Sequence, residues 1–301
     1  MLERRAFEPE FLHKLDGLVL SATRARTRRA GRRVVGRVQG NGIEPENYRE
    51  YAPGDDLRFL DWNALARLDD LTIRTFRADR QVEVTVLIDA SASMGVPEAD
   101  DKFGLARLLG AGLAYVAMSK NDPVRLAAFS RRGASPRLEA TRFYRRQESY
   151  IELRPFVTGL ATGGETRMAA AVGQLLNARR APGMVFVLSD FLVVAADYET
   201  ALADLTAAHH EVKVVHVMGE REMAGAYPPG AYRLRDCESG AVREATLGPA
   251  AAASCRARAA QHGDRVRAFC ASRGVTYAQA FGANAVDEII LREFPRLGGL
   301  A

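Results

Sequence analysis

Two strongly apolar segments, each ending in an aspartate, constrain the fold of this chain more than any other feature. The first reads VEVTVLID and ends at Asp89, and the second reads MVFVLSD and ends at Asp190. Around them, segments with helical spacing of apolar residues alternate with further short apolar runs. This alternation predicts an α/β fold, in which helices cover both faces of a doubly wound, mostly parallel sheet.

The expected elements follow one another along most of the chain. Strands are predicted at 71–78, 82–89, 124–130, 184–190, 211–218 and 275–281. Helices are predicted at 102–119, 166–180, 198–210, 251–273 and Ala285 to Phe294, and the interval 137–165 favours a short strand followed by a helix. A late β-hairpin is expected at 231–247, with its turn near Ser239 and Gly240.

Residues 1–70 are predicted to form an N-terminal extension, and residues 71–301 the sheet domain. An amphipathic helix is expected up to about residue 20, because apolar side chains recur there at helical spacing. Residues 21–40 carry seven arginines and no acidic residue, which is typical of a solvated arm or of a phosphate-binding surface. Residues 47–67 alternate charges around aromatic side chains, and we interpret them as a structural clasp or, alternatively, a binding surface.

The composition excludes several classes of protein. The chain has 301 residues, 48% of them hydrophobic, so it can bury a full core. No apolar run reaches the roughly 20 residues that span a bilayer, and the N-terminus lacks a signal-peptide pattern, so a cytoplasmic location is expected. The three cysteines lack zinc-site spacing and are interpreted as free thiols. The sequence contains no P-loop motif of the kind that binds nucleotide phosphates.

Polar oxygens are expected to gather at one edge of the predicted sheet. The segment DASASM places two hydroxyls directly after Asp89. Because parallel strands of such a sheet present their carboxyl ends to one ligand-binding edge, we expect these groups to converge with the other strand end. The candidate metal ligands are Asp89, Ser91, Ser93, Thr166 and Asp190. An all-oxygen set favours Mg²⁺, with Mn²⁺ or Ca²⁺ as alternatives, and disfavours zinc or copper.

Two other interpretations of this segment remain open. Asp89 or a serine could simply cap the start of a helix. A hydrolase is the second alternative, since phosphatases that form an aspartyl phosphate also use an aspartate at a strand end. Such enzymes want a second acid two residues later, where this chain has Ser91, and no histidine follows either aspartate. We therefore do not expect an enzyme.

The order of these residues resembles the metal-ion-dependent adhesion site of von Willebrand factor A domains. That site combines Asp-x-Ser-x-Ser after an apolar strand, a Gly-Gly loop with a threonine that opens a helix, and an aspartate at the end of a later strand. The upstream run REYAPGDDLRFLDWNALAR, followed by a strand and DASASM, resembles the hallmark of the bacterial family called domain of unknown function 58. The resemblance covers about residues 35–295.

The resemblance implies specific roles for the candidate residues. Ser91 and Ser93 would bind the metal directly, and Thr166 directly or through water. Asp89 and Asp190 would hold metal-bound waters and the serine hydroxyls. Thr162 lies nearby, and whether it or Thr166 completes the site stays open.

The same resemblance suggests what the protein does. Proteins of this family are commonly paired with MoxR-type AAA+ ATPases, which implies a metal-dependent adaptor that links the ATPase to a protein client in a chaperone-like or assembly role. An acidic residue of the bound protein would complete the metal's coordination. The alternative is a regulator that binds anionic surfaces through the arginines between residues 24 and 37.

Overall fold

The computed structural model describes residues 2–16, 47–53, 57–68, 70–75, 81–132, 135–178, 181–225 and 228–282. The chain divides into two compact units, one made of Met1–Arg26 with Val82–Ala301 and the other of Thr27–Gln81. This division differs from the expected boundary after residue 70. The first helices belong with the sheet, and the strand expected from residue 71 belongs to the small unit.

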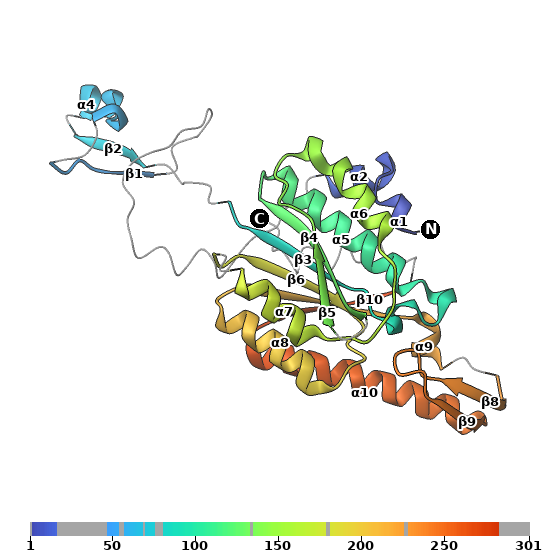
Figure 1. The fold of residues 1–301 in the computed structure, drawn as a ribbon. Helices are drawn as coiled ribbons and strands as arrows, with labels where there is room; N and C mark the ends of the chain where they lie inside the picture. Colours follow the sequence, from blue (N-terminus) through green and yellow to red (C-terminus); the bar gives the residue numbers. More distant parts are fainter. Residues whose placement is uncertain are drawn as a thin grey trace. The chain divides into compact units, whose positions relative to one another are not determined.

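A six-stranded sheet forms the centre of the larger unit (Figure 1). Its strands are β3 (Val84–Asp89), β4 (Val124–Arg132), β5 (Ser135–Ala140), β6 (Met184–Ser189), β7 (Glu211–Met218) and β10 (Thr276–Phe281). Their order is β10-β7-β6-β3-β4-β5, and only β5 runs antiparallel to its neighbour. The chain leaves β3 in one direction and returns to its other side at β6, so strand order reverses between these two strands. The predicted doubly wound, mostly parallel sheet is confirmed.

Helices cover both faces of this sheet (Figure 1). On one face lie α1 (Leu2–Arg5), α2 (Pro9–Leu15), α5 (Lys102–Ser119), η4 (Gln147–Leu153) and α6 (Arg154–Gly159). On the other lie α7 (Met168–Asn177), α8 (Ala195–Ala207) and α10 (Pro249–Arg273). Side chains of β3 alternate between the two cores, with Val86 and Ile88 on the α5 face and Leu87 on the α7 face. Strand β3 is therefore apolar on both sides.

The N-terminal helix expected up to residue 20 is instead two short helices. Pro9 is the first residue of α2, a position that proline tolerates, but the ring cannot continue a helix from α1. Phe11 and Leu15 are buried and lie close to Gly112 of α5. This packing explains why the segment belongs to the sheet unit. Residues 17–20 lie outside the described residues.

Shorter elements complete the larger unit. They are η2 (Ala92–Gly95), η3 (Glu98–Asp100), α9 (Glu220–Ala224), β8 (Gly230–Arg235) and β9 (Val242–Leu247). Strands β8 and β9 pair antiparallel, which confirms the late hairpin. The arginine-rich segment 21–40 and the helix expected from Ala285 to Phe294 lie outside the described residues. Among the helices that are described, none has the length and apolar character needed to cross a membrane.

The small unit is built on a two-stranded sheet. Strands β1 (Asn47–Glu50) and β2 (Thr72–Thr75) pair antiparallel, and η1 (Leu57–Phe59) and α4 (Trp62–Leu68) lie between them in sequence. Asp61 is buried and caps α4, since its Oδ1 accepts the backbone N–H groups of Asn63 and Ala64. Trp62 is 61% exposed, so it is not a core residue of this unit.

Candidate functional site

The loop after β3 is organised around the buried carboxylate of Asp89. Asp89 Oδ1 accepts the backbone N–H of Ser91 at 2.9 Å, and Oδ2 accepts the hydroxyl of Ser189 at 2.6 Å. All three residues are fully buried. Asp89 therefore joins the end of β3 to the end of the neighbouring strand β6 and holds the turn that presents Ser91.

A second loop is tied to the first by backbone hydrogen bonds. Gly163 N–H donates to the Ala90 carbonyl, and Ala92 N–H donates to the Gly164 carbonyl, both at 2.9 Å. Gly164 has φ of 78°, a left-handed conformation that glycine adopts without strain. The glycine pair thus brings the segment before α7, including Thr166, to the edge of the site.

Asp190 connects the remaining candidate ligands. Its Oδ1 accepts the Ser93 hydroxyl at 3.2 Å, and the Ser93 Oγ lies 3.0 Å from the Ser91 Oγ. Ser93 and Asp190 are buried as well. Four of the five predicted residues, Asp89, Ser91, Ser93 and Asp190, therefore share one hydrogen-bonded network at the point where strand order reverses.

Both candidate threonines border this network. Thr166 is 2% exposed, but its hydroxyl donates to Glu238 of the β8–β9 hairpin rather than to a serine. Thr162 packs on η2, because a Cβ at Gly95 would lie only 2.8 Å from the Thr162 Oγ1. The sequence did not indicate that Glu238 lies at this edge.

Sequence reasoning also missed a lysine at the centre of the site. Lys102, the first residue of α5, has a wholly buried side chain whose Nζ lies 3.0 Å from Asp190 Oδ2 and 2.7 Å from Glu222 Oε1. Burial lowers the pKa of Lys102, but the charges of Asp190 and Glu222 outweigh it and raise the pKa above its usual value. The ammonium group is thus held charged. The available signal was a lysine opening a helix that is otherwise almost entirely apolar.

Two histidines hold the Asp190 backbone from the neighbouring elements. His216 Nε2 and His262 Nε2 lie 3.0 and 3.1 Å from the Asp190 carbonyl oxygen, so each ring nitrogen must donate there. His216 lies opposite Ser189 in the β6–β7 register, which a sequence alone does not give. Burial lowers the pKa of His216 to about 3, with the neighbouring His262 adding to the effect, so His216 is neutral.

The electrostatics of the site leave negative charge uncompensated. Burial, and then repulsion by Asp190, raise the pKa of Asp89 to about 7. The carboxylates of Asp190 and Glu222 share the one ammonium group of Lys102, and the third carboxylate, that of Asp89, is repelled by Asp190. When all are ionised, two negative charges lack a partner in this network, so a divalent cation would relieve the repulsion.

The donor set also fits Mg²⁺ in its geometry. Adjacent ligands of an octahedral Mg²⁺ ion, each about 2.1 Å from the metal, lie about 3.0 Å apart. The Ser91 and Ser93 oxygens are separated by 3.0 Å. Within the described ranges, no group of three or more His, Cys, Asp or Glu side chains could hold a metal by itself. The candidate site therefore depends on hydroxyl oxygens.

A cleft of about 660 Å³ opens beside the candidate site. Thr166, Glu238 and His262 line it, together with Leu192 and Val194. Leu192 and Val194 are 46% and 76% exposed, although both are apolar. The site therefore opens onto a surface that combines acidic groups with exposed aliphatic side chains.

Comparison with known proteins places the chain in a family. A family model described as "Protein of unknown function DUF58" matches residues 47–268. The chain belongs to the DUF58 family. This match confirms the family that the upstream run and DASASM resembled, and it spans the small unit from residue 47 onward as well as most of the sheet. The fold of this DUF58 chain is the doubly wound, mostly parallel α/β sheet that the sequence predicted.

Relatives and solved structures give further context. Uncharacterised proteins of Mycobacterium bovis and Mycobacterium tuberculosis are 33% identical to the DUF58 chain over 237 residues, which cover 77% of it and 73% of each relative. The structure of the conserved hypothetical protein BatB from Bacteroides thetaiotaomicron aligns with a TM-score of 0.42 at 16% identity, over 72% of this chain and 98% of BatB. The SpRpn10 VWA domain aligns with a TM-score of 0.41 at 12% identity, over 74% and 100%.

Proposed function

We propose that this chain is a cytoplasmic, Mg²⁺-dependent protein-binding module that acts as an adaptor and not as an enzyme. The observation that carries this proposal is the network at the β3–β6 switch point, where paired hydroxyls and unbalanced carboxylates are buried beside an open cleft. A bound Mg²⁺ would supply a Lewis-acidic position that accepts a carboxylate from another protein.

The residues of this site would have two roles, binding the cation and orienting the groups that bind it. Ser91, Ser93 and Thr166 would hold the cation through neutral oxygens, while Asp89 and Asp190 would orient the serine hydroxyls and bound water. Lys102 holds Asp190 through the carboxylate oxygen that Ser93 does not contact. Because these three hydroxyl ligands are uncharged, the cation would retain affinity for a carboxylate.

One coordination bond cannot make a protein interface specific, so the partner must also contact the surface around the site. A specific protein interface commonly buries about 1,200 to 2,000 Å², so a partner must contact a wider area. The exposed Leu192 and Val194 beside the cleft offer apolar contacts for such a partner. The family resemblance suggests a MoxR-type AAA+ ATPase as one partner and a protein client as the other.

The test is a titration of the MoxR-type ATPase of the same bacterium against this chain. Wild type and Ser91→Ala/Ser93→Ala are each measured in Mg²⁺ and in EDTA. We expect binding by the wild type in Mg²⁺ only, because both the cation and its hydroxyl ligands are required. Val194→Ser serves as a second variant, which should weaken binding without changing the response of the melting temperature to Mg²⁺.

Equal binding in all four conditions would refute metal-dependent binding of this partner. The anionic-surface alternative would then gain support if binding weakened steeply with salt, as contacts to phosphates do. Turnover of a phosphate ester that depends on Asp89 would instead support the hydrolase alternative.

A further inference from the structure

The β8–β9 hairpin carries a carboxylate to the edge of the candidate metal site. Glu238 lies in the turn between the strands, and its Oε1 accepts both the hydroxyl of Thr166 at 3.0 Å and the backbone N–H of Thr166 at 3.3 Å. The two residues are 72 positions apart in sequence. Thr166 is the candidate ligand that the serine network does not contact, so a carboxylate already occupies this side of the site.

The turn holds Glu238 in this position without using its side chain. Asp236 Oδ1 accepts the backbone N–H groups of Glu238 at 3.0 Å and Ser239 at 2.6 Å, together with the Ser239 hydroxyl at 2.8 Å. These bonds make an aspartate-capped turn that fixes the backbone on both sides of Glu238. The turn therefore does not need the Glu238 carboxylate, which can bind Thr166 or a cation.

Exposure indicates that this contact is not a structural bond of the core. Most side chains of β8 and β9 are exposed, including Leu234 and Val242. The hairpin buries little apolar surface, so moving it away would cost little core packing.

We propose that Glu238 is an internal ligand of the metal site, which completes the cation's coordination in the free protein and is displaced by a partner's carboxylate. This inference rests on the proposed function. The observation behind it is the Glu238 carboxylate bonded to Thr166 at the mouth of the cleft. The hairpin then lowers the apparent affinity for a partner, because an incoming carboxylate must compete with one tethered to the same chain.

The test is a Mn²⁺ titration followed by electron paramagnetic resonance, with acetate as the added carboxylate. The proteins are wild type, Glu238→Ala, Ser91→Ala/Ser93→Ala and Glu244→Ala. Glu244 is the matched control because it is an exposed carboxylate on the same hairpin. Melting curves without metal establish that the variants fold.

We expect Glu238→Ala to bind Mn²⁺ about 10- to 100-fold more weakly than the wild type, as loss of a supporting carboxylate does at other metal sites. Acetate should restore part of this affinity in Glu238→Ala and leave the wild type and Glu244→Ala unchanged. Rescue by acetate distinguishes a vacant coordination position from a damaged fold.

The outcomes separate the two proposals. Mn²⁺ binding by Glu238→Ala that equals or exceeds that of the wild type, with no effect of acetate, would overturn the internal ligand while the metal site stands. If the wild type binds no Mn²⁺, or binds it as well after both serines are replaced, the proposed metal site is itself wrong and the internal ligand falls with it.

Discussion

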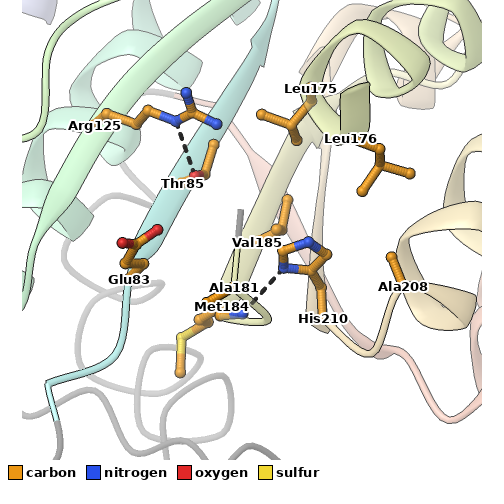
Figure 2. Close-up of a pocket in the computed structure, with 11 residues that line it drawn as sticks. Glu83, Thr85, Arg125, Leu175, Leu176, Ala181, Met184, Val185, Ala208 and His210 are labelled. Carbon is orange, nitrogen blue, oxygen red and sulfur yellow. Dashed lines mark hydrogen bonds between the residues drawn. The ribbon is translucent and has the colours of Figure 1, made fainter. Parts of the chain in front are cut away.

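The two ends of the central strands both bury polar side chains, but they do so with different balances of charge. At the amino ends, a small cavity of about 110 Å³ is lined by residues that include Glu83, Thr85, Arg125 and His210 (Figure 2). There Arg125 Nε donates to the Thr85 hydroxyl at 3.2 Å, and Gly183 N–H donates to His210 Nδ1 at 3.1 Å (Figure 2).

At the carboxyl ends, carboxylates outnumber cations instead. Asp89 and Asp190 are buried together, and Lys102 divides its single charge between Asp190 and Glu222. One carboxylate and one guanidinium line the amino-end cavity, so the formal charges there are equal. The comparison teaches that buried polar groups alone do not identify a ligand site, whereas buried charge left without a counterion does.

Replacing the buried lysine should have the largest effect on stability. Lys102→Met leaves Asp190 and Glu222 without their cation, and breaking a buried ion pair costs about 3 to 5 kcal/mol. We expect this loss in urea unfolding without metal, and a partial recovery in Mg²⁺ because the cation replaces the missing charge. The control is Lys120→Ala at the exposed end of α5, which should change stability by no more than about 0.5 kcal/mol. An effect of Lys102→Met as small as that of the control would show that the buried carboxylates at the carboxyl ends do not need this cation.

A substitution at the amino ends of the central strands should destabilise the fold without changing how much Mg²⁺ stabilises the protein. A Cβ at Gly183 would lie 2.2 Å from the Glu83 carbonyl oxygen, so Gly183→Ala must push β6 away from its neighbour. We expect a loss of about 1 to 3 kcal/mol in urea unfolding, as for overpacked cores. Gly173→Ala in α7 is the matched control, since its Cβ meets nothing within 4 Å and alanine favours the helix. If Gly183→Ala changed the stabilisation by Mg²⁺, the two ends would not be independent.

The smallest expected effect is a pH-dependent one at His210. Burial lowers the pKa of His210 in the folded protein, and protonation would remove the Nδ1 acceptor of Gly183. Because the folded pKa lies below the unfolded one, this contribution is fully present above the unfolded pKa of about 6.5 and is lost as the pH falls below it. Wild type should exceed His210→Ala by about 1 kcal/mol at neutral pH, with the gap closing toward pH 5. The difference between the two proteins cancels shared contributions, such as that of Asp89, and a gap that widens in acid would contradict this assignment.

The candidate site could be predicted where it depends on strand ends and not where it depends on packing. Asp89 and Asp190 each follow an apolar strand, and the edge shared by parallel strands brings them and the two serines together. Lys102 could not be predicted in this way, because a lysine at the start of a helix is ordinarily exposed and its partners are 88 and 120 residues away. Glu238 was missed for the same reason, since nothing local indicates that the hairpin turn lies against Thr166.

For the fold as well, features set by local sequence patterns could be predicted, and features set by contacts distant in sequence could not. Alternating apolar segments predicted the sheet and most of its helices, because each pattern reflects one buried face. The boundary of the sheet unit was harder to predict, because it depends on β1 pairing with β2 and on Phe11 packing near Gly112. Such contacts join segments that carry no mutual signal in a single sequence.

The central claim is that the unbalanced charge and paired hydroxyls at the carboxyl ends of β3 and β6 bind a divalent cation. The most direct test is thermal unfolding of the wild type and of Ser91→Ala/Ser93→Ala, titrated with Mg²⁺ and with EDTA. Ligand binding to the folded state should stabilise the wild type by about 2.7 kcal/mol when free Mg²⁺ reaches 100 times its Kd, and the double variant should fold but show no such shift. Ser119→Ala, distant from the site, should respond as the wild type does. A wild-type melting temperature that is indifferent to Mg²⁺, Mn²⁺ and EDTA would contradict the account.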